Sequence, residues 1–282
     1  MTETPTFADV AESLRTATGL LTGSSDTPRL DVELLMAHAL GVERSALLLD
    51  PGRHQVPEGF GELVARRMAH EPMAYILGYR DFWTLRIKVG PGVLIPRPDS
   101  ETLIEAALSR IDDTGAPLRL LDLGTGPGTL LLALLSELPE AAGLGIDASR
   151  VALALADENA RALGMADRAV FREGDWAAEV AGDFDVILCN PPYIADTEWL
   201  MPDVADHEPA EALFAGADGL DDYRRIIPDL PRLLAPGGAA VLEIGASQLM
   251  SVSALAEAAG FAVACRRDLG DRDRALVLTF AS

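Results

Sequence analysis

Hydrophobic and polar positions along the first 75 residues follow a helical repeat. The stretch from Phe7 to Leu21 places apolar residues at helical spacing, and a second run from Arg29 to Leu40 ends at Gly41, a residue typical of helix C-termini. A third helix is predicted from about residue 57 to residue 69. These helices are short and amphipathic, and they carry no chemical motif. Residues 1–75 are therefore predicted to form a helical domain that serves packing or docking.

The pattern changes after residue 75. Residues 82–89 alternate in the manner of a strand, a Gly-Pro-Gly turn follows at 90–92, and residues 93–95 form the returning strand. Pro96 and Pro98 exclude a helix at that point, and Asp99 is the expected N-cap of a helix that ends at Leu108. We interpret residues 76–98 as a β-hairpin linker between two domains.

Strands and helices alternate through residues 99–282. Such alternation predicts a mainly parallel sheet covered by helices on both faces. A polar connection joins the last two predicted strands, which indicates an antiparallel hairpin at the sheet edge. The predicted fold class is α/β, with a seven-stranded sheet and a small N-terminal helical domain. The predicted strands are 118–123, 144–147, 169–172, 184–189, 239–243, 261–265 and 274–280, and the helices between them include 129–138 and 149–163.

The charge of the chain restricts its partners. There are 44 acidic and 23 basic residues, which gives a formal net charge of −21 and a pI near 4.4. A surface this acidic repels phosphate backbones, which argues against sequence-independent binding of nucleic acid. Hydrophobic residues make up 49% of the chain, so a sizeable core is expected and disorder is not.

The sequence lacks the signals of membrane, secreted, disulfide-bonded and metal-binding proteins. No apolar run reaches the about 18 residues of a membrane span, and the segment from Met1 to Pro5 has neither a basic start nor an apolar stretch typical of a secretory signal. The two cysteines, Cys189 and Cys265, lack CxxC spacing, and the four histidines are scattered. We therefore expect a cytoplasmic protein without disulfides, membrane contact or bound metal.

A glycine-rich turn follows the first strand of the predicted sheet. Glycines at 124, 126 and 128 let the backbone pass close to a ligand, while amides of the following helix point toward it. Asp147 ends the second strand, where a carboxylate can accept hydrogen bonds from both ribose hydroxyls. A dinucleotide and S-adenosylmethionine both fit, and the GxGxG form favours S-adenosylmethionine. The predicted cofactor-binding residues of this turn and strand end are Gly124, Thr125, Gly126, Pro127, Gly128 and Asp147.

The predicted cofactor site is completed by two residues of the segment that follows the third strand. Trp176 is expected to pack over the adenine ring, and Asp175 is expected to accept a hydrogen bond from the adenine amino group.

The fourth strand ends directly in Asn190-Pro191-Pro192-Tyr193, next to the glycine-rich turn in a parallel sheet. The prolines hold Asn190 and Pro191 extended. The Asn190 side-chain oxygen and the Pro191 carbonyl can each accept one N–H of a target –NH2 group, which directs its nitrogen at a methyl group. Tyr193 can stack on the flat target group.

These residue types suit methyl transfer to a nitrogen whose lone pair is delocalised, as in an amide or an aromatic amine. Two acceptors favour the more tetrahedral geometry in which the lone pair is available. A sulfonium is already a good leaving group, so positioning the reacting atoms roughly 3–3.5 Å apart does most of the work. No strong general base is required, because the proton becomes acidic once the nitrogen is methylated. Catalysis is therefore assigned to Asn190, Pro191 and Tyr193, and substrate binding to these residues and Pro192.

Together these motifs resemble the HemK/PrmC family, bacterial methyltransferases that act on the glutamine side-chain nitrogen of peptide chain release factors. The resemblance covers nearly the whole chain. Asn-Pro-Pro-Tyr is shared with amino-directed DNA and RNA methyltransferases, whereas Ile-Pro-Arg-Pro at 95–98 and Gly-Leu-Asp-Asp-Tyr-Arg at 219–224 are more particular.

The resemblance implies a class I S-adenosylmethionine-dependent methyltransferase domain over residues 99–282. It implies a cofactor held by residues 124–128, Asp147, Trp176 and Asn190, and a substrate glutamine held by residues 190–193. It also implies that the N-terminal helices grip a release factor whose target lies in a Gly-Gly-Gln loop. Arg97 is expected near the roof of the cofactor site, and His207 stands where the family usually has an aromatic residue.

Three other functions stay open at this point. They are glutamine methylation of a large-subunit ribosomal protein, methylation of adenine or cytosine in nucleic acid, and non-catalytic binding of S-adenosylmethionine and a partner. Residues 196–222 contain nine carboxylates and neither Lys nor Arg. An acidic rim beside the target pocket would repel nucleic acid and attract a basic protein loop, which favours a protein substrate.

Overall fold

The computed structural model describes residues 9–280, and these divide into two compact units. A helical unit comprises the chain up to Tyr79 together with Leu200–His207, and a sheet unit comprises Arg80–Trp199 together with the chain from Glu208 onward. No helix within the described range has the length and apolar character needed to cross a membrane. The functional division at residues 75 and 98 stays a prediction.

The helical unit is built around a compact apolar core. Leu35, Met36 and Phe60 are fully buried in it, each contributing about 1.5–3 kcal/mol through loss of contact with water. The Asp9 carboxylate caps the first helix by accepting from the Glu12 amide at 2.9 Å, and Gly41 ends the second with φ of 66°, as predicted. Phe7 lies outside the described residues. The helices are α1 (Val10–Leu20), α2 (Pro28–Leu40), α3 (Arg44–Leu49), α4 (Phe60–Met68) and α5 (Met73–Leu77), with 3-10 turns Leu21–Gly23 and Pro51–Arg53.

A buried arginine joins the distant segment Leu200–His207, which contains the short helix α9 (Pro202–Ala205), to the helical unit. Arg67 donates to Asp31 at 2.8 Å and to Asp203 at 2.7 Å, and His70 contacts the other Asp203 oxygen at 2.9 Å. Removing one partner of such a buried pair costs about 3–5 kcal/mol, because a charge is left unpaired. Asp203 is therefore a structural residue of this unit.

The predicted hairpin exists, but its position in the sequence was wrong. The strands are β1 (Tyr79–Phe82) and β2 (Leu85–Lys88), so the turn lies at residues 83–84 and residues 93–95 form no strand. Trp83 takes a left-handed φ of 55°, with its amide donating to Glu101 at 2.8 Å and its indole to Glu137 at 2.7 Å. These contacts from distant helices stabilise a turn that local alternation does not reveal.

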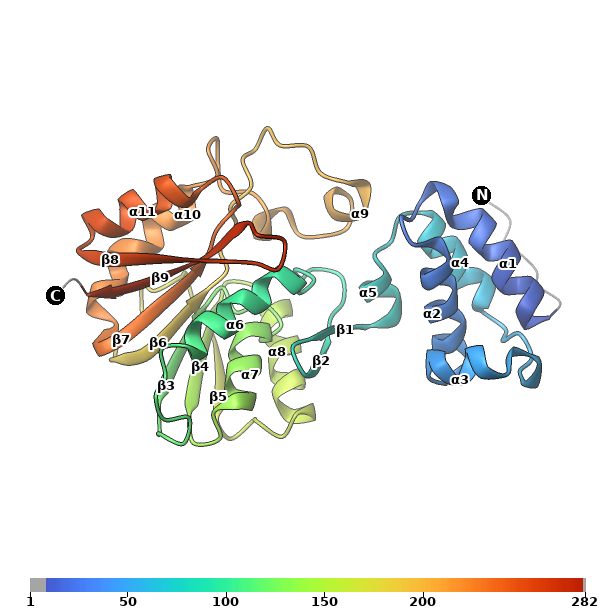
Figure 1. Cartoon of the computed structure of the whole chain (residues 1–282), viewed down its shortest axis with the longest axis horizontal. Helices are drawn as coiled ribbons and strands as arrows, with labels where there is room; N and C mark the ends of the chain where they lie inside the picture. Colours follow the sequence, from blue (N-terminus) through green and yellow to red (C-terminus); the bar gives the residue numbers. More distant parts are fainter. Residues whose placement is uncertain (1–8, 281–282) are drawn as a thin grey trace. The chain divides into compact units, whose positions relative to one another are not determined.

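The sheet unit contains the predicted seven-stranded sheet, in the order β5-β4-β3-β6-β7-β9-β8 (Figure 1). β9 runs antiparallel to both β7 and β8, and the remaining pairs are parallel, which confirms the antiparallel edge. The strands are β3 (Arg119–Leu123), β4 (Ala142–Asp147), β5 (Ala169–Glu173), β6 (Phe184–Cys189), β7 (Leu234–Glu243), β8 (Phe261–Arg267) and β9 (Asp273–Phe280).

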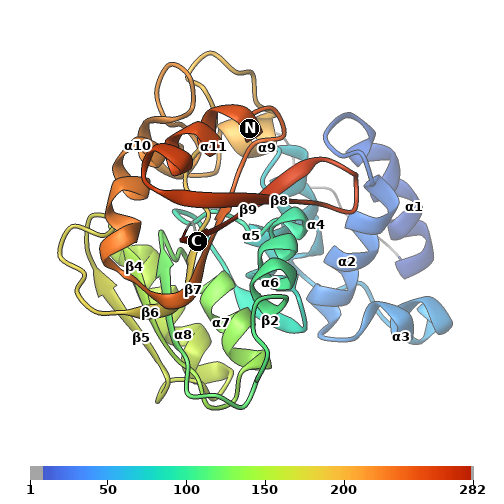
Figure 2. The ribbon, with the colours of Figure 1, turned by 60° about the vertical axis from the view of Figure 1, so that its left-hand side comes forward.

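Helices cover both faces of this sheet, as Figure 1 and the turned view in Figure 2 show. One face carries α6 (Glu101–Leu108), α7 (Thr129–Glu137) and α8 (Arg150–Ala162), and the other carries α10 (Asp221–Ile226) and α11 (Leu249–Ala258). The apolar strand residues are buried between these layers, which explains their near-continuous hydrophobic runs. Short 3-10 helices at Pro98–Ser100, Ala210–Ala212 and Ile227–Arg232 complete the unit.

The predicted N-cap of α6 was wrong. A 3-10 turn over Pro98–Ser100 precedes α6, so Ser100 rather than Asp99 occupies the N-cap position. The Asp99 carboxylate instead lies 3.3 Å from Arg274, which is 6% exposed. A buried guanidinium attracts a carboxylate more strongly than a helix end does, because it needs a charged partner.

The register of the sheet brings its functional ends together. Leu123 pairs with both Ile146 and Cys189, and Cys189 pairs with Leu242. The residues that follow these positions in the chain therefore share one edge of the sheet, the crevice where open α/β folds bind ligands.

Candidate active site

A cavity of about 430 Å³ opens at this edge, within the range of roughly 300–1,000 Å³ typical of small-molecule sites. Most residues predicted to bind cofactor or substrate line it, whereas Gly128, Pro191 and Tyr193 are not among its lining residues. The predicted residues that line it are Gly124, Thr125, Gly126, Pro127, Asp147, Asp175, Trp176, Asn190 and Pro192.

The first wall is the turn between β3 and α7, where glycine is required by both conformation and space. Gly124 has φ of 72°, and a Cβ there would lie 2.8 Å from the ring of Trp176. Gly128 has φ of 83° and occupies the N-cap position of α7. The turn therefore places backbone amides and a helix N-terminus beside the cavity.

Asp147, at the end of β4, holds this turn from the side. One carboxylate oxygen accepts the Gly126 amide at 2.8 Å, and the other accepts the Ser149 amide at 2.8 Å. Each oxygen keeps a further lone pair, so the carboxylate can also accept from ribose hydroxyls. Burial raises the pKa of Asp147, and the backbone amides oppose that rise.

A second carboxyl group lies beneath the turn. Asp122 is fully buried and accepts the Thr125 hydroxyl at 2.7 Å. Burial raises the pKa of Asp122 to about 7. Its role in fixing the turn was not predicted, although it lies only two residues before Gly124.

Asp222 of the Gly-Leu-Asp-Asp-Tyr-Arg segment, and Arg225 directly after that segment, support the second wall. The Trp176 indole donates to Asp222 at 3.1 Å, and both Asp175 oxygens lie 2.6 Å from Arg225. Asp222 and Arg225 line the cavity. The motif at residues 219–224 contains Asp222 but not Arg225, and the sequence alone predicted no role for either residue. The acceptor role of Asp175 toward adenine stays a prediction.

The third wall is the segment after β6. Asn190 lines the cavity, and its Nδ2 donates to the Ser100 hydroxyl at 3.3 Å. Pro191 and Pro192 are buried. The Tyr193 hydroxyl donates to the Glu243 carboxyl at 3.2 Å. Burial raises the pKa of the Tyr193 phenol well above its usual range, so it stays protonated. Stacking of Tyr193 on the target group stays a prediction.

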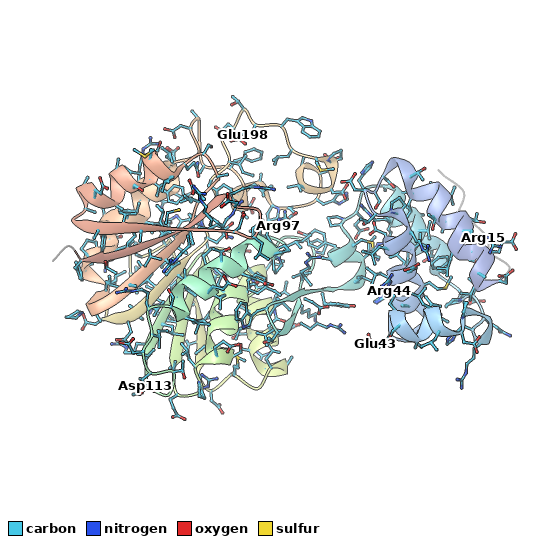
Figure 3. The ribbon with its side chains drawn as sticks, in the orientation of Figure 1. Arg15, Glu43, Arg44, Arg97, Asp113 and Glu198 are labelled. Carbon is cyan, nitrogen blue, oxygen red and sulfur yellow. The ribbon has the colours of Figure 1, made fainter. Side chains whose placement is uncertain are left out.

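Arg97, labelled in Figure 3, lines the cavity on the loop before α6. Its Nη2 donates to Glu208 at 2.5 Å, and the other oxygen of this buried carboxylate accepts the Ile95 amide at 3.0 Å. Glu208 thereby fixes the loop that local sequence predicted as a strand. His207 belongs to the helical unit, where its Nε2 lies 3.4 Å from the Ala69 carbonyl.

Much of the acidic segment is neutralised by arginines from elsewhere in the chain. Asp203 pairs with Arg67, Glu208 with Arg97, Asp222 with Arg225, and both Asp218 and Asp221 with Arg224. The predicted acidic rim is correspondingly weaker. The carboxylates that form no ion pair with any residue of the described range are Asp196, Glu198, Asp206 and Glu211.

The donor set fits S-adenosylmethionine, because a glycine turn, a strand-end carboxylate and an indole surround one cavity. Between residues 9 and 280, no group of three or more His, Cys, Asp and Glu side chains has the arrangement of a metal site.

Two family models match the chain: the PrmC N-terminal domain over residues 12–78 and the methyltransferase small domain over residues 100–207. The release factor glutamine methyltransferase of Rhodospirillum rubrum is 46% identical over 258 residues, covering 89% of this chain and 79% of its own length. That of Cereibacter sphaeroides is 44% identical over 271 residues, covering 94% of this chain and 96% of its own.

A solved methyltransferase from Pyrococcus furiosus shares the fold, with a TM-score of 0.50 and 17% identity. The match covers 69% of this chain and 88% of that one.

Proposed function

Because the chain belongs to the family of release factor glutamine methyltransferases, we propose that it methylates the glutamine of the Gly-Gly-Gln loop of a peptide chain release factor. The methyl group comes from S-adenosylmethionine and goes to the side-chain amide nitrogen. The observation that carries the proposal is the position of Asn190, in one cavity with the turn at residues 124–127.

The cofactor half of the cavity binds and orients. Gly126 and its neighbours approach the cofactor with backbone, Asp147 accepts from the ribose, and Trp176 covers the adenine. When bound, S-adenosylmethionine supplies an electrophilic methyl group on a sulfonium. Because this leaving group is already good, no metal ion and no strong base is required.

The substrate half orients the glutamine. The Asn190 side-chain oxygen and the Pro191 carbonyl each accept one N–H of the target amide, which reduces delocalisation of the nitrogen lone pair and directs it at the methyl group. Correct placement at contact distance is the main source of rate, and a displacement of about 1 Å costs about 100-fold. The proton leaves to solvent after the nitrogen is methylated.

The helical unit serves as the docking domain for the release factor in this proposal. A domain that works against ribosomal RNA is expected to be basic, and the unpaired carboxylates Asp196, Glu198 and Glu211 of the sheet unit attract such a surface. Association should therefore weaken as salt rises. A substrate that functions in translation also places the protein in the cytoplasm.

The test offers all rival substrates together. The purified protein is incubated with labelled S-adenosylmethionine and with release factor, ribosomes or DNA, and the label is located. Label in the release factor alone supports the proposal. Label confined to ribosomal protein or to nucleic acid would support the corresponding rival and refute the proposal.

A further inference from the structure

We propose that Glu243 is a positioning residue for methyl transfer: through Ser100 it sets the orientation of the Asn190 amide, and through the Tyr193 hydroxyl it fixes the segment after β6. This inference rests on the proposed function and deepens it. From the sequence alone, Glu243 was predicted only to end a strand.

Glu243 lies directly behind the Asn190–Tyr193 segment. It is the last residue of β7, next to β6 in the sheet, and it is 1% exposed. Its Oε1 accepts the Tyr193 hydroxyl at 3.2 Å, and its backbone carbonyl accepts the buried Tyr223 hydroxyl at 2.6 Å. Oε2 is buried without a well-aligned partner in the described part of the chain. Burying a carboxyl oxygen without such a partner lowers the stability of the fold, so its presence here calls for a functional explanation.

Ser100 connects Glu243 to the cavity. Burial raises the pKa of the Glu243 carboxyl to about 7, and a hydrogen bond from the Ser100 hydroxyl opposes that rise. The same hydroxyl accepts from Asn190 Nδ2 at 3.3 Å. Because a serine hydroxyl has a single proton, one that donates toward Glu243 can serve Asn190 only as an acceptor.

This direction of hydrogen bonding determines which end of the amide faces the substrate. The two ends of an asparagine side chain are similar in shape, and their hydrogen-bond partners decide between them. With Nδ2 held by Ser100, the oxygen of Asn190 is left to accept from the target –NH2. Without an acceptor at Glu243, the Ser100 hydroxyl can donate to the Asn190 oxygen. The Asn190 –NH2 group then faces the target –NH2 group, and two donors cannot form a hydrogen bond.

Two charged groups influence the Glu243 carboxyl. Arg274 lowers the pKa of Glu243, and Asp99 raises it. Arg274 is itself held by Asp268 at 3.2 Å and by the Ile244 carbonyl at 3.2 Å. The Arg274 guanidinium that acts on this carboxyl is therefore fixed by the protein and not by the ligand, as preorganisation of a site requires.

The first test replaces Glu243 by glutamine, which keeps the volume and supplies a donor that can reverse the Ser100 bond. We expect Glu243→Gln to lower kcat by about 10- to 100-fold, the equivalent of one charged hydrogen bond, while the cofactor Kd changes by about twofold or less. Kinetics with release factor as substrate and calorimetry with S-adenosylmethionine give the two values. An unchanged kcat, or an equal loss of cofactor affinity, would overturn the proposal.

The second test uses Ser100. Ser100→Ala should lose rate as Glu243→Gln does, and Ser100→Thr, which keeps the hydroxyl, should recover most of that loss. The double variant Glu243→Gln/Ser100→Ala should be no slower than the slower single variant, because both act through one chain of hydrogen bonds. Multiplicative losses would show independent roles and contradict the inference.

The wild-type reaction separates this inference from the proposed function. If wild-type protein leaves release factor unmodified, the proposed function fails and the inference fails with it. If wild type is active and Glu243→Gln matches its kcat, only the inference fails. Should Glu243→Gln not fold, the Ser100→Ala and Ser100→Thr pair decides the matter alone.

Discussion

The two halves of the cavity are held in place by different means. The cofactor half is a backbone structure, in which positive-φ glycines form the turn and Asp147 accepts two main-chain amides. The substrate half is a side-chain structure, in which Asn190 and Tyr193 depend on Ser100 and Glu243. Substitutions in the first half should therefore change cofactor affinity, and substitutions in the second should change turnover.

The largest effect is expected at the turn itself. Gly124→Ala imposes a left-handed φ on alanine, at about 1–2 kcal/mol, and drives its Cβ into Trp176, which adds about 1–3 kcal/mol. We expect a corresponding fall in the free energy of unfolding, measured by urea denaturation, and a large rise in the cofactor Kd.

Gly126→Ala is the matched control for that substitution. Gly126 also has a positive φ of 56°, but a Cβ there meets nothing within 4 Å. Only the conformational cost should appear, so this variant should unfold at higher urea concentration than Gly124→Ala. Equal losses in the two variants would show that the Trp176 contact does not limit the turn.

Asp147→Asn should have the next largest effect. Asparagine keeps one acceptor oxygen but puts a donor toward one of the two amides that the carboxylate now binds. We expect the cofactor Kd to rise by about 10-fold, the equivalent of about 1.4 kcal/mol, with kcat at saturating cofactor nearly unchanged. A fall in kcat without a change in Kd would remove the distinction between the two halves.

A further prediction concerns the pH dependence of stability. Burial raises the pKa of Asp122 from 3.8 to about 7, so the folded state binds this proton more tightly than the unfolded state. Its contribution to stability is complete below pH 3.8 and is lost as the pH rises through about 7. Asp122→Asn keeps an acceptor for Thr125, and its free energy of unfolding should vary less over this range than that of wild type. An equally steep pH dependence would contradict the assignment.

The sequence predicts the cofactor half of the site better than the substrate half. The glycine turn and Asp147 could be predicted because strand, turn and strand end lie close together in the chain. Ser100, Glu243 and Arg274 could not, because contacts between distant segments create their roles; Asp99 and Arg274 are 175 positions apart. A residue can lie in a strong motif and still have its partner set by the fold.

The errors in the fold have the same origin. The alternating pattern near Trp83 predicted a strand, but contacts with Glu101 and Glu137 place the turn there. The acidic segment at 196–222 predicted an exposed negative rim, but arginines outside the segment pair with more than half of its carboxylates. Charge counted along a sequence does not show which charges the fold pairs.

The central claim is that Asn190 directs a glutamine amide at the methyl group. Release factor incubated with S-adenosylmethionine and either wild-type protein or Asn190→Ala is digested, and mass spectrometry locates the added methyl groups. We predict one methyl group on the glutamine of the Gly-Gly-Gln loop with wild type, and a rate lower by about 100-fold with Asn190→Ala at nearly equal cofactor affinity. Methylation at another residue, or an Asn190→Ala variant that turns over at the wild-type rate, would contradict the claim.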